Sequence, residues 1–168
     1  MTGGEEFSLA SAQRAADEGR LAEWVVDFLA SPGSDNAPLA AALAFSGATY
    51  LGPIRFELDR ITPMAGPEND DVVVPVAEQD WESDVEAMEH SIEHGWHPPP
   101  LLVSHRDGKY FLEDGNHRYE TLRRSGAIQA WTILLFADEA ERNRFLEEHG
   151  GLGDRPTIRR ARRERLYP

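Results

Sequence analysis

The sequence predicts a mixed α/β (α+β) domain that follows an N-terminal helical extension. Three features lead to this fold class. Residues 1–50 show hydrophobic spacing of the helical kind, whereas residues 51–150 alternate between strand-like and helix-like segments. Within the second region, Asp107-Gly108 separates two strand-like runs and predicts a tight β-hairpin. We therefore expect a helical extension at 1–50, an α/β domain at 51–150 and a basic tail at 151–168.

The composition indicates a cytoplasmic protein without a membrane segment. The 168 residues are 40% hydrophobic and 28% charged, which is enough apolar material for a buried core. No apolar run approaches the roughly 18 residues that cross a bilayer, and the acidic N-terminal residues do not match a signal peptide. The absence of cysteine excludes disulfides, thiolate catalysis and cysteine-ligated metal sites.

The net charge of −13 is unevenly distributed along the chain. From Arg155 onward there are six arginines and one glutamate, so the tail carries about +5 and the rest of the chain about −18. An acidic body repels the phosphate backbone of DNA. We interpret the tail as a solvated or folded-back arm, and DNA binding through it is possible but not favoured.

Helical patterns fill the N-terminal extension, at residues 8–18, 20–30 and 37–45. The second helix has an apolar stripe formed by Leu21, Trp24, Val25, Phe28 and Leu29. Pro32-Gly33 ends this helix, and Asn36 is a candidate N-cap for the third. We interpret the extension as a cap or a partner-binding element.

The α/β domain begins with a half-buried strand at 53–61, where Ile54, Phe56 and Leu58 alternate with charged residues. We expect a loop at 62–71 and a second strand at 72–76, in which Pro75 marks an edge or a strand end. The later elements are a helix at 80–94, hairpin strands at 100–104 and 109–113, a helix at 116–125, a strand at 130–136 and a helix at 138–149.

The junction between the hairpin and the next helix carries a group of polar residues, namely Asp114, Gly115, Asn116, His117 and Arg118. The first N–H groups of a helix have no intrahelical partners, and the helix dipole makes that end positive, so it binds phosphate well. Glycine lets a ligand approach the backbone, and arginine forms a bidentate pair with phosphate oxygens. Spacing alone leaves two interpretations open, a plain strand-to-helix junction and an anion site.

A resemblance to the ParB/sulfiredoxin superfamily bears on this choice. The segment "GWHPPPLLVSHRDGKYFLEDGNHRYETLRRSG", preceded by "FELDRI" and a helix, is similar to a divergent ParB N-terminal-like domain. The shared order is a short strand, a helix, a Gly-x-x-x-Pro phrase, a hairpin and a Gly-x-x-Arg phrase that opens a helix. The match covers roughly residues 54–136.

The resemblance implies a ParB/sulfiredoxin-like mixed sheet packed with helices, and a nucleotide site. Carried over by position, it assigns the phosphates to Gly115, Asn116, His117 and Arg118. From its own place directly before the glycine, Asp114 is a candidate to hold a ribose hydroxyl or Mg2+. It assigns the wall of the base pocket to residues 95–101, including Trp96 and Pro99. The ligands it implies are ATP, ADP or CTP with Mg2+.

This sequence departs from the best-known members of the superfamily. Asn116 stands where sulfiredoxin has its catalytic cysteine, so reduction of a sulfinic acid is excluded. Asn116-His117 also replaces the Glu-Arg pair of the partition proteins, and no helix-turn-helix or dimerisation domain follows in this sequence. The sequence does not establish whether the chain is an enzyme.

Three functions stay open on this basis. The first is a nucleotide-dependent phosphotransferase or nucleotidase, with a general base among Glu68, Glu78, Asp80 and Glu82. The second is a DNA-associated adaptor without catalysis, and the third is an interaction protein with a vestigial site. His90 and His94, four residues apart, are expected to be surface residues rather than metal ligands.

Overall fold

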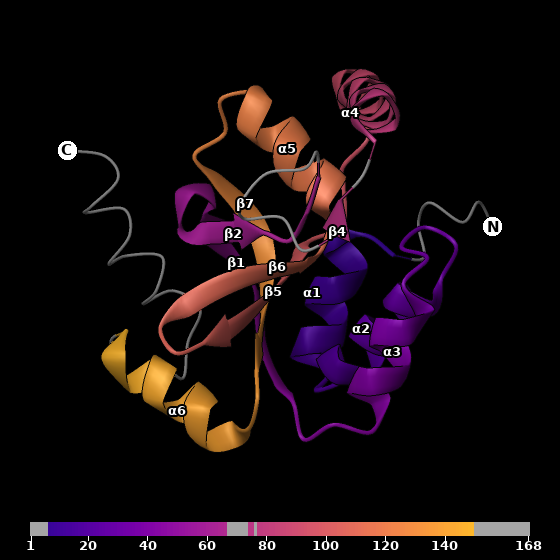
Figure 1. Cartoon of the computed structure of the whole chain (residues 1–168). Coiled ribbons are helices and arrows are strands. Elements are labelled where there is room, and N and C mark those ends of the chain that lie inside the picture. The colour runs from indigo at the N-terminus through magenta and orange to yellow at the C-terminus, as the bar shows by residue number, and fades with distance from the viewer. Residues whose placement is uncertain (1–6, 67–73, 76, 150–168) are drawn as a thin grey trace.

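The computed structural model describes residues 7–66, 74–75 and 77–149 (Figure 1). The helices are α1 (Leu9–Asp17), α2 (Leu21–Ala30), α3 (Ala37–Ala44), α4 (Glu78–Glu93), α5 (Asn116–Arg124), α6 (Glu139–Glu148) and the 3-10 helix η1 (Leu58–Arg60). The strands are β1 (Thr49–Glu57), β2 (Ile61–Pro63), β3 (Ala65–Gly66), β4 (Val74–Pro75), β5 (Leu101–Arg106), β6 (Lys109–Asp114) and β7 (Gln129–Phe136). No helix in these described segments is long and apolar enough to cross a bilayer.

A five-stranded mixed sheet with the order β1-β7-β5-β6-β2 forms the centre of the structure. β1 and β7 are antiparallel, as are β5 and β6, whereas β7 and β5 run parallel, as do β6 and β2. The strands β3 and β4 pair separately in a short parallel ladder. The predicted fold class, a mixed sheet packed with helices, is confirmed.

Helices cover both faces of the sheet (Figure 1). Side chains alternate between the faces along each strand, so Leu101 and Val103 of β5 enter one core while Leu102 enters the other. The first core lies towards α5 and α6 and includes Tyr119 and Phe145. The second core lies between the sheet and α1–α3. The N-terminal extension therefore covers one face of the sheet.

The N-terminal extension packs against the sheet through the apolar stripe of α2, which the sequence predicts. Leu21, Trp24, Val25, Phe28 and Leu29 are all buried. Their core continues into the sheet through Leu102 and Ile133. Phe7, Trp24 and Phe28 form an aromatic cluster, in which the Trp24 and Phe28 rings stack with centroids 5.1 Å apart. Such ring pairs stabilise a core beyond the area they bury.

The hairpin turn has the geometry that Asp-Gly predicts. Asp107 and Gly108 have φ values of 51° and 76°. Positive φ at both central residues is the type I′ arrangement, whose twist matches the twist of the flanking strands. The hairpin therefore places the end of β6, and the start of α5 directly after it, in a fixed register with β5.

The prediction of a loop at 62–71 is wrong for the first residues of this segment. The structure has β2 at Ile61–Pro63 and β3 at Ala65–Gly66. β2 pairs in parallel with β6, about fifty residues further along the chain, and local sequence patterns do not report such a partner. Of the strand expected at 72–76, the described part is Val74–Pro75, which ends at the proline. Glu68 and the tail 151–168 lie outside the described residues.

Candidate functional site

Gly115 joins β6 to α5 and is the N-cap residue of that helix. Its φ of 102° and ψ of 29° are accessible to glycine and strained for other residues. A Cβ atom at this position would lie 2.8 Å from Arg118 Nη2 and 2.8 Å from Leu101 Cδ2. The guanidinium of Arg118 therefore packs directly against the glycine at the start of the helix. Among the described residues, no side chain caps α5 by a hydrogen bond.

Arg118 and Asp114 form a buried ion pair on either side of Gly115. Arg118 Nη2 donates to Asp114 Oδ2 at 3.1 Å and to the carbonyl of Pro100 at 3.3 Å. Arg118 is 6% exposed and Asp114 is 8% exposed. Because the charges of the pair cancel, the positive potential at this place comes mainly from the helix end.

The Nε atom of Arg118 is buried and has no hydrogen-bond partner among the described residues. A buried donor without a partner costs about 1–3 kcal/mol, which is why such groups usually meet water, an ion or a ligand. This donor belongs to a side chain that lies against Gly115. The start of α5 thus combines an uncapped helix end with an unsatisfied guanidinium N–H.

Two residues of the N-terminal extension reach the ion pair. Ser34, in the turn between α2 and α3, donates its hydroxyl to Asp114 Oδ1 at 2.9 Å. The Phe28 ring of α2 lies under the guanidinium of Arg118, with its centroid 5.5 Å from Cζ. Sequence reasoning missed both contacts because they join residues about eighty or more positions apart, and no local pattern indicates them.

Asn116 holds a neighbouring segment and does not cap the helix. Its side-chain Oδ1 accepts hydrogen bonds from the backbone N–H groups of Met64 and Ala65, at 3.1 and 3.0 Å. The residue that occupies the N-cap position is Gly115. Asn116 therefore fixes the segment between β2 and β3 against the start of α5.

His117 packs between α5 and α4. Its ring lies on Trp81 with centroids 4.5 Å apart, and its Nε2 is 3.5 Å from a carboxylate oxygen of Asp84. Burial lowers the pKa of His117 below its ordinary value of 6.5, Asp84 raises this pKa, and Arg118 lowers it. The neutral imidazole is thus the form that the fold favours.

The low pKa of His117 predicts a loss of stability in acid. As the pH falls below 6.5, the unfolded chain takes up a proton at His117 that the folded chain does not bind, so the free energy of unfolding decreases. We expect wild-type protein to lose more stability than His117→Gln between pH 7.5 and 5.5, measured by urea unfolding. All other residues are the same in the two proteins, so equal losses would contradict this assignment.

The predicted wall of the base pocket, residues 95–101, follows α4 and leads into β5. Trp96 is 37% exposed and Pro99 is half-buried. The contact from this segment to Arg118 is the carbonyl of Pro100. The role of Trp96 and Pro99 as a pocket wall remains a prediction.

The alternative site residues lie on α4. Glu82 accepts two hydrogen bonds from Arg124, which lower the pKa of its carboxyl. Glu78 and Asp80 are exposed in the first turn of α4. His90 and His94 are also exposed, as predicted, with ring centroids 4.1 Å apart. The described residues contain no group of three or more side chains that could hold a metal ion.

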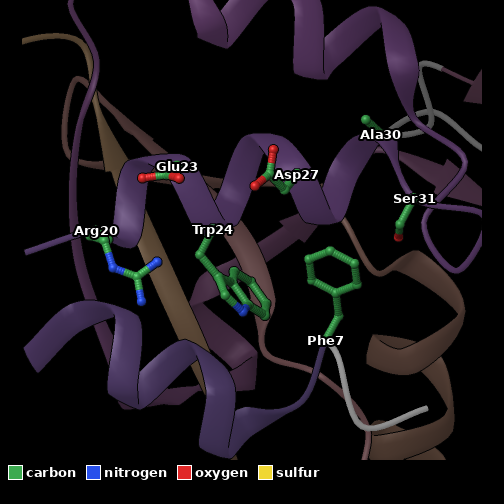
Figure 2. A pocket seen from close by; sticks show the side chains of 7 residues that line it. All are labelled: Phe7, Arg20, Glu23, Trp24, Asp27, Ala30 and Ser31. Atoms are coloured by element: carbon green, nitrogen blue, oxygen red, sulfur yellow. The ribbon is translucent and has the colours of Figure 1, made fainter. Parts of the chain in front are cut away.

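A shallow recess of about 460 Å3 lies beside α2 (Figure 2). Figure 2 shows Phe7 and Trp24 at its centre and the carboxylate of Asp27 at its rim, with Ser31 at the far end. Ser31 is the first residue after α2, in the same turn as Ser34. Sequence reasoning gave no signal for this recess, because it arises from the packing of residue 7 against α2.

No known family and no curated protein matches the sequence, whereas solved structures do match. A mutant free serine kinase in complex with ADP is 25% identical, with a TM-score of 0.38, and the match covers 48% of this chain and 30% of the kinase. Sulfiredoxin from Arabidopsis thaliana is 20% identical, with a TM-score of 0.34, and 58% of this chain and 94% of that protein are covered. ParB from Caulobacter crescentus, complexed with CTP-gamma-S, is 16% identical, with a TM-score of 0.32, and 73% of this chain and 54% of ParB are covered.

The proteins found by this comparison belong to the superfamily that the sequence resembles. The described chain spans about a third of the free serine kinase that it matches. The chain is thus similar to proteins with the ParB/sulfiredoxin-like fold, at low identity and TM-score.

Proposed function

We propose that this protein binds a nucleotide and that the start of α5 holds its phosphate groups. The observation that supports this most is the buried Nε of Arg118, which has no hydrogen-bond partner in the part of the chain that the structure describes and belongs to a side chain packed against Gly115. It lies at a helix end that no side chain of the described segments caps. Both features favour an anion, because both present N–H donors that need an acceptor.

Phosphate binding at this place depends on the backbone as much as on Arg118. Asp114 already neutralises the guanidinium, so the ion pair has little net charge to offer an anion. The first N–H groups of α5 and the helix dipole supply the remaining attraction. The absence of a side chain at Gly115 lets the guanidinium of Arg118 lie at the helix start, because a Cβ atom there would be 2.8 Å from Arg118 Nη2.

Mg2+ fits this site only as a companion of the phosphates. Mg2+ takes oxygen ligands in near-octahedral geometry and keeps several waters. Both oxygens of Asp114 are already engaged, one by Ser34 and the other by Arg118. The ion would therefore be held by phosphate oxygens and water, and ATP, ADP and CTP remain candidate ligands. The more specific proposal is that the protein is a nucleotide-dependent phosphotransferase or a nucleotidase.

The test is calorimetric titration of ATP, ADP, CTP and GTP, each with Mg2+, into the full chain. We expect binding of at least one of them. Arg118→Lys keeps the charge opposite Asp114 but loses the planar donors, so it should weaken that binding about tenfold.

Arg106→Lys is the matched control. Arg106 lies at the hairpin end of β5, is 54% exposed and pairs with Glu113, so its replacement should leave the affinity unchanged. An absence of binding by all four nucleotides would show the proposal to be wrong. Equal weakening by both variants would show that binding is elsewhere.

A further inference from the structure

The turn between α2 and α3 inserts a hydroxyl group into the proposed site. Ser34 donates to Oδ1 of Asp114, and Arg118 donates to Oδ2, so each carboxylate oxygen has one partner. Asp114 is the last residue of β6 and directly precedes the glycine at the helix start. If a ligand binds with its phosphates at the start of α5, its neighbouring atoms would lie within reach of Asp114 Oδ1, the oxygen that accepts the hydrogen bond from Ser34.

The turn that carries Ser34 is also held by hydrogen bonds that do not involve Asp114. It is braced internally, because the N–H of Asp35 donates to Ser31 O at 2.8 Å and the N–H of Asn36 donates to Leu29 O at 2.9 Å. Pro32, Gly33 and Asp35 are exposed. Withdrawal of Ser34 costs its hydrogen bond to Asp114, whereas these two internal bonds remain.

Phe28 differs from Ser34 in this respect. It is 3% exposed, stacks on Trp24 and contacts Arg118 from the core of the extension. The extension thus contributes a buried ring, Phe28, and a half-buried hydroxyl, Ser34, to the surroundings of the ion pair. The acceptor of the Ser34 hydroxyl is a buried carboxylate oxygen of Asp114. Beside the proposed phosphate site, such an oxygen can also accept a hydrogen bond from the hydroxyl of a ligand.

We propose that Ser34 is an internal competitor for the ligand, and that its hydroxyl occupies the position of a ligand hydroxyl at Asp114. The inference rests on the proposed function and deepens it. The ligand class is a phosphate compound that also carries a hydroxyl group, as the ribose of a nucleotide does. Binding of such a compound exchanges the Ser34 hydrogen bond for one from the ligand, so wild-type affinity is lowered by the occupancy of Ser34.

The test compares two probes on the full chain, ADP with Mg2+ and inorganic pyrophosphate with Mg2+. Ser34→Ala removes the competitor, and we expect ADP to bind about tenfold more tightly than to wild type. Pyrophosphate has no hydroxyl attached to carbon, so its affinity should not change. Ser31→Ala is the control, because its hydroxyl donates to Phe28 O in the same turn and does not contact Asp114.

Each result of this test supports or overturns the inference. A selective gain for ADP in Ser34→Ala supports it. Binding of ADP that is equal or weaker in Ser34→Ala, or an equal gain for pyrophosphate, overturns the inference and leaves the proposed phosphate site in place. If neither probe nor any other nucleotide binds to wild type or variant, the proposed function is wrong and the inference falls with it.

Discussion

Replacement of Arg118 by alanine is expected to lower the free energy of unfolding by about 3–5 kcal/mol. The side chains of Arg118 and Asp114 are 7% and 9% exposed, so alanine would leave the Asp114 carboxylate buried without its positive partner. It would also leave the Pro100 carbonyl without a donor. Equilibrium unfolding in urea, followed by circular dichroism, measures this loss.

The matched control for this prediction is Arg123→Ala. Arg123 lies on the same helix but is 59% exposed, and its pair with Glu120 is a surface ion pair, so we expect a change of about 0–1 kcal/mol. A double-mutant cycle with Asp114→Ala separates the pair from its surroundings. If Arg118→Ala costs no more than Arg123→Ala, the ion pair does not stabilise the junction.

Replacement of Phe28 by alanine should also cost about 3–5 kcal/mol. Phe28 is 3% exposed in the core between the extension and the sheet. Alanine would leave a cavity there and remove both the stacking on Trp24 and the contact with the Arg118 guanidinium. The same urea unfolding experiment measures the effect.

Phe45→Ala provides the comparison. Phe45 belongs to the same extension, immediately after α3, and is 93% exposed. Its replacement should change the free energy of unfolding by less than about 0.5 kcal/mol. Equal effects of the two variants, or a two-step transition in wild-type protein, would show that the extension does not share a core with the sheet.

Much of this fold follows from short-range signals. The hairpin is predicted by Asp107-Gly108, because few other residue pairs tolerate positive φ at both positions. The stripe of α2 is predicted by its spacing, and all five of its apolar residues are buried. The start of α5 is predicted because Gly115 interrupts a strand pattern and a helical pattern follows at once.

The features that local patterns do not predict depend on distant partners. β2 forms because β6 offers a free edge, and nothing in residues 61–63 encodes that edge. The burial of Arg118 depends on Phe28 and Pro100, and the occupancy of Asp114 depends on Ser34. The sequence therefore indicates which residues meet at the junction. The pairing of Arg118 with Asp114, and the contacts of Phe28 and Ser34 with this pair, depend on tertiary packing.

The central claim is that the start of α5 binds the phosphates of a nucleotide. Amide chemical shifts of the 15N-labelled full chain, recorded while ADP and Mg2+ are added, test it most directly. We predict that the largest shifts fall on the N–H groups of Gly115, Asn116, His117 and Arg118, with saturation at one ligand per chain. Saturable shifts that lie elsewhere, for example at Trp24 and Asp27 in the recess beside α2, would contradict the claim, as would the absence of shifts at residues 115–118.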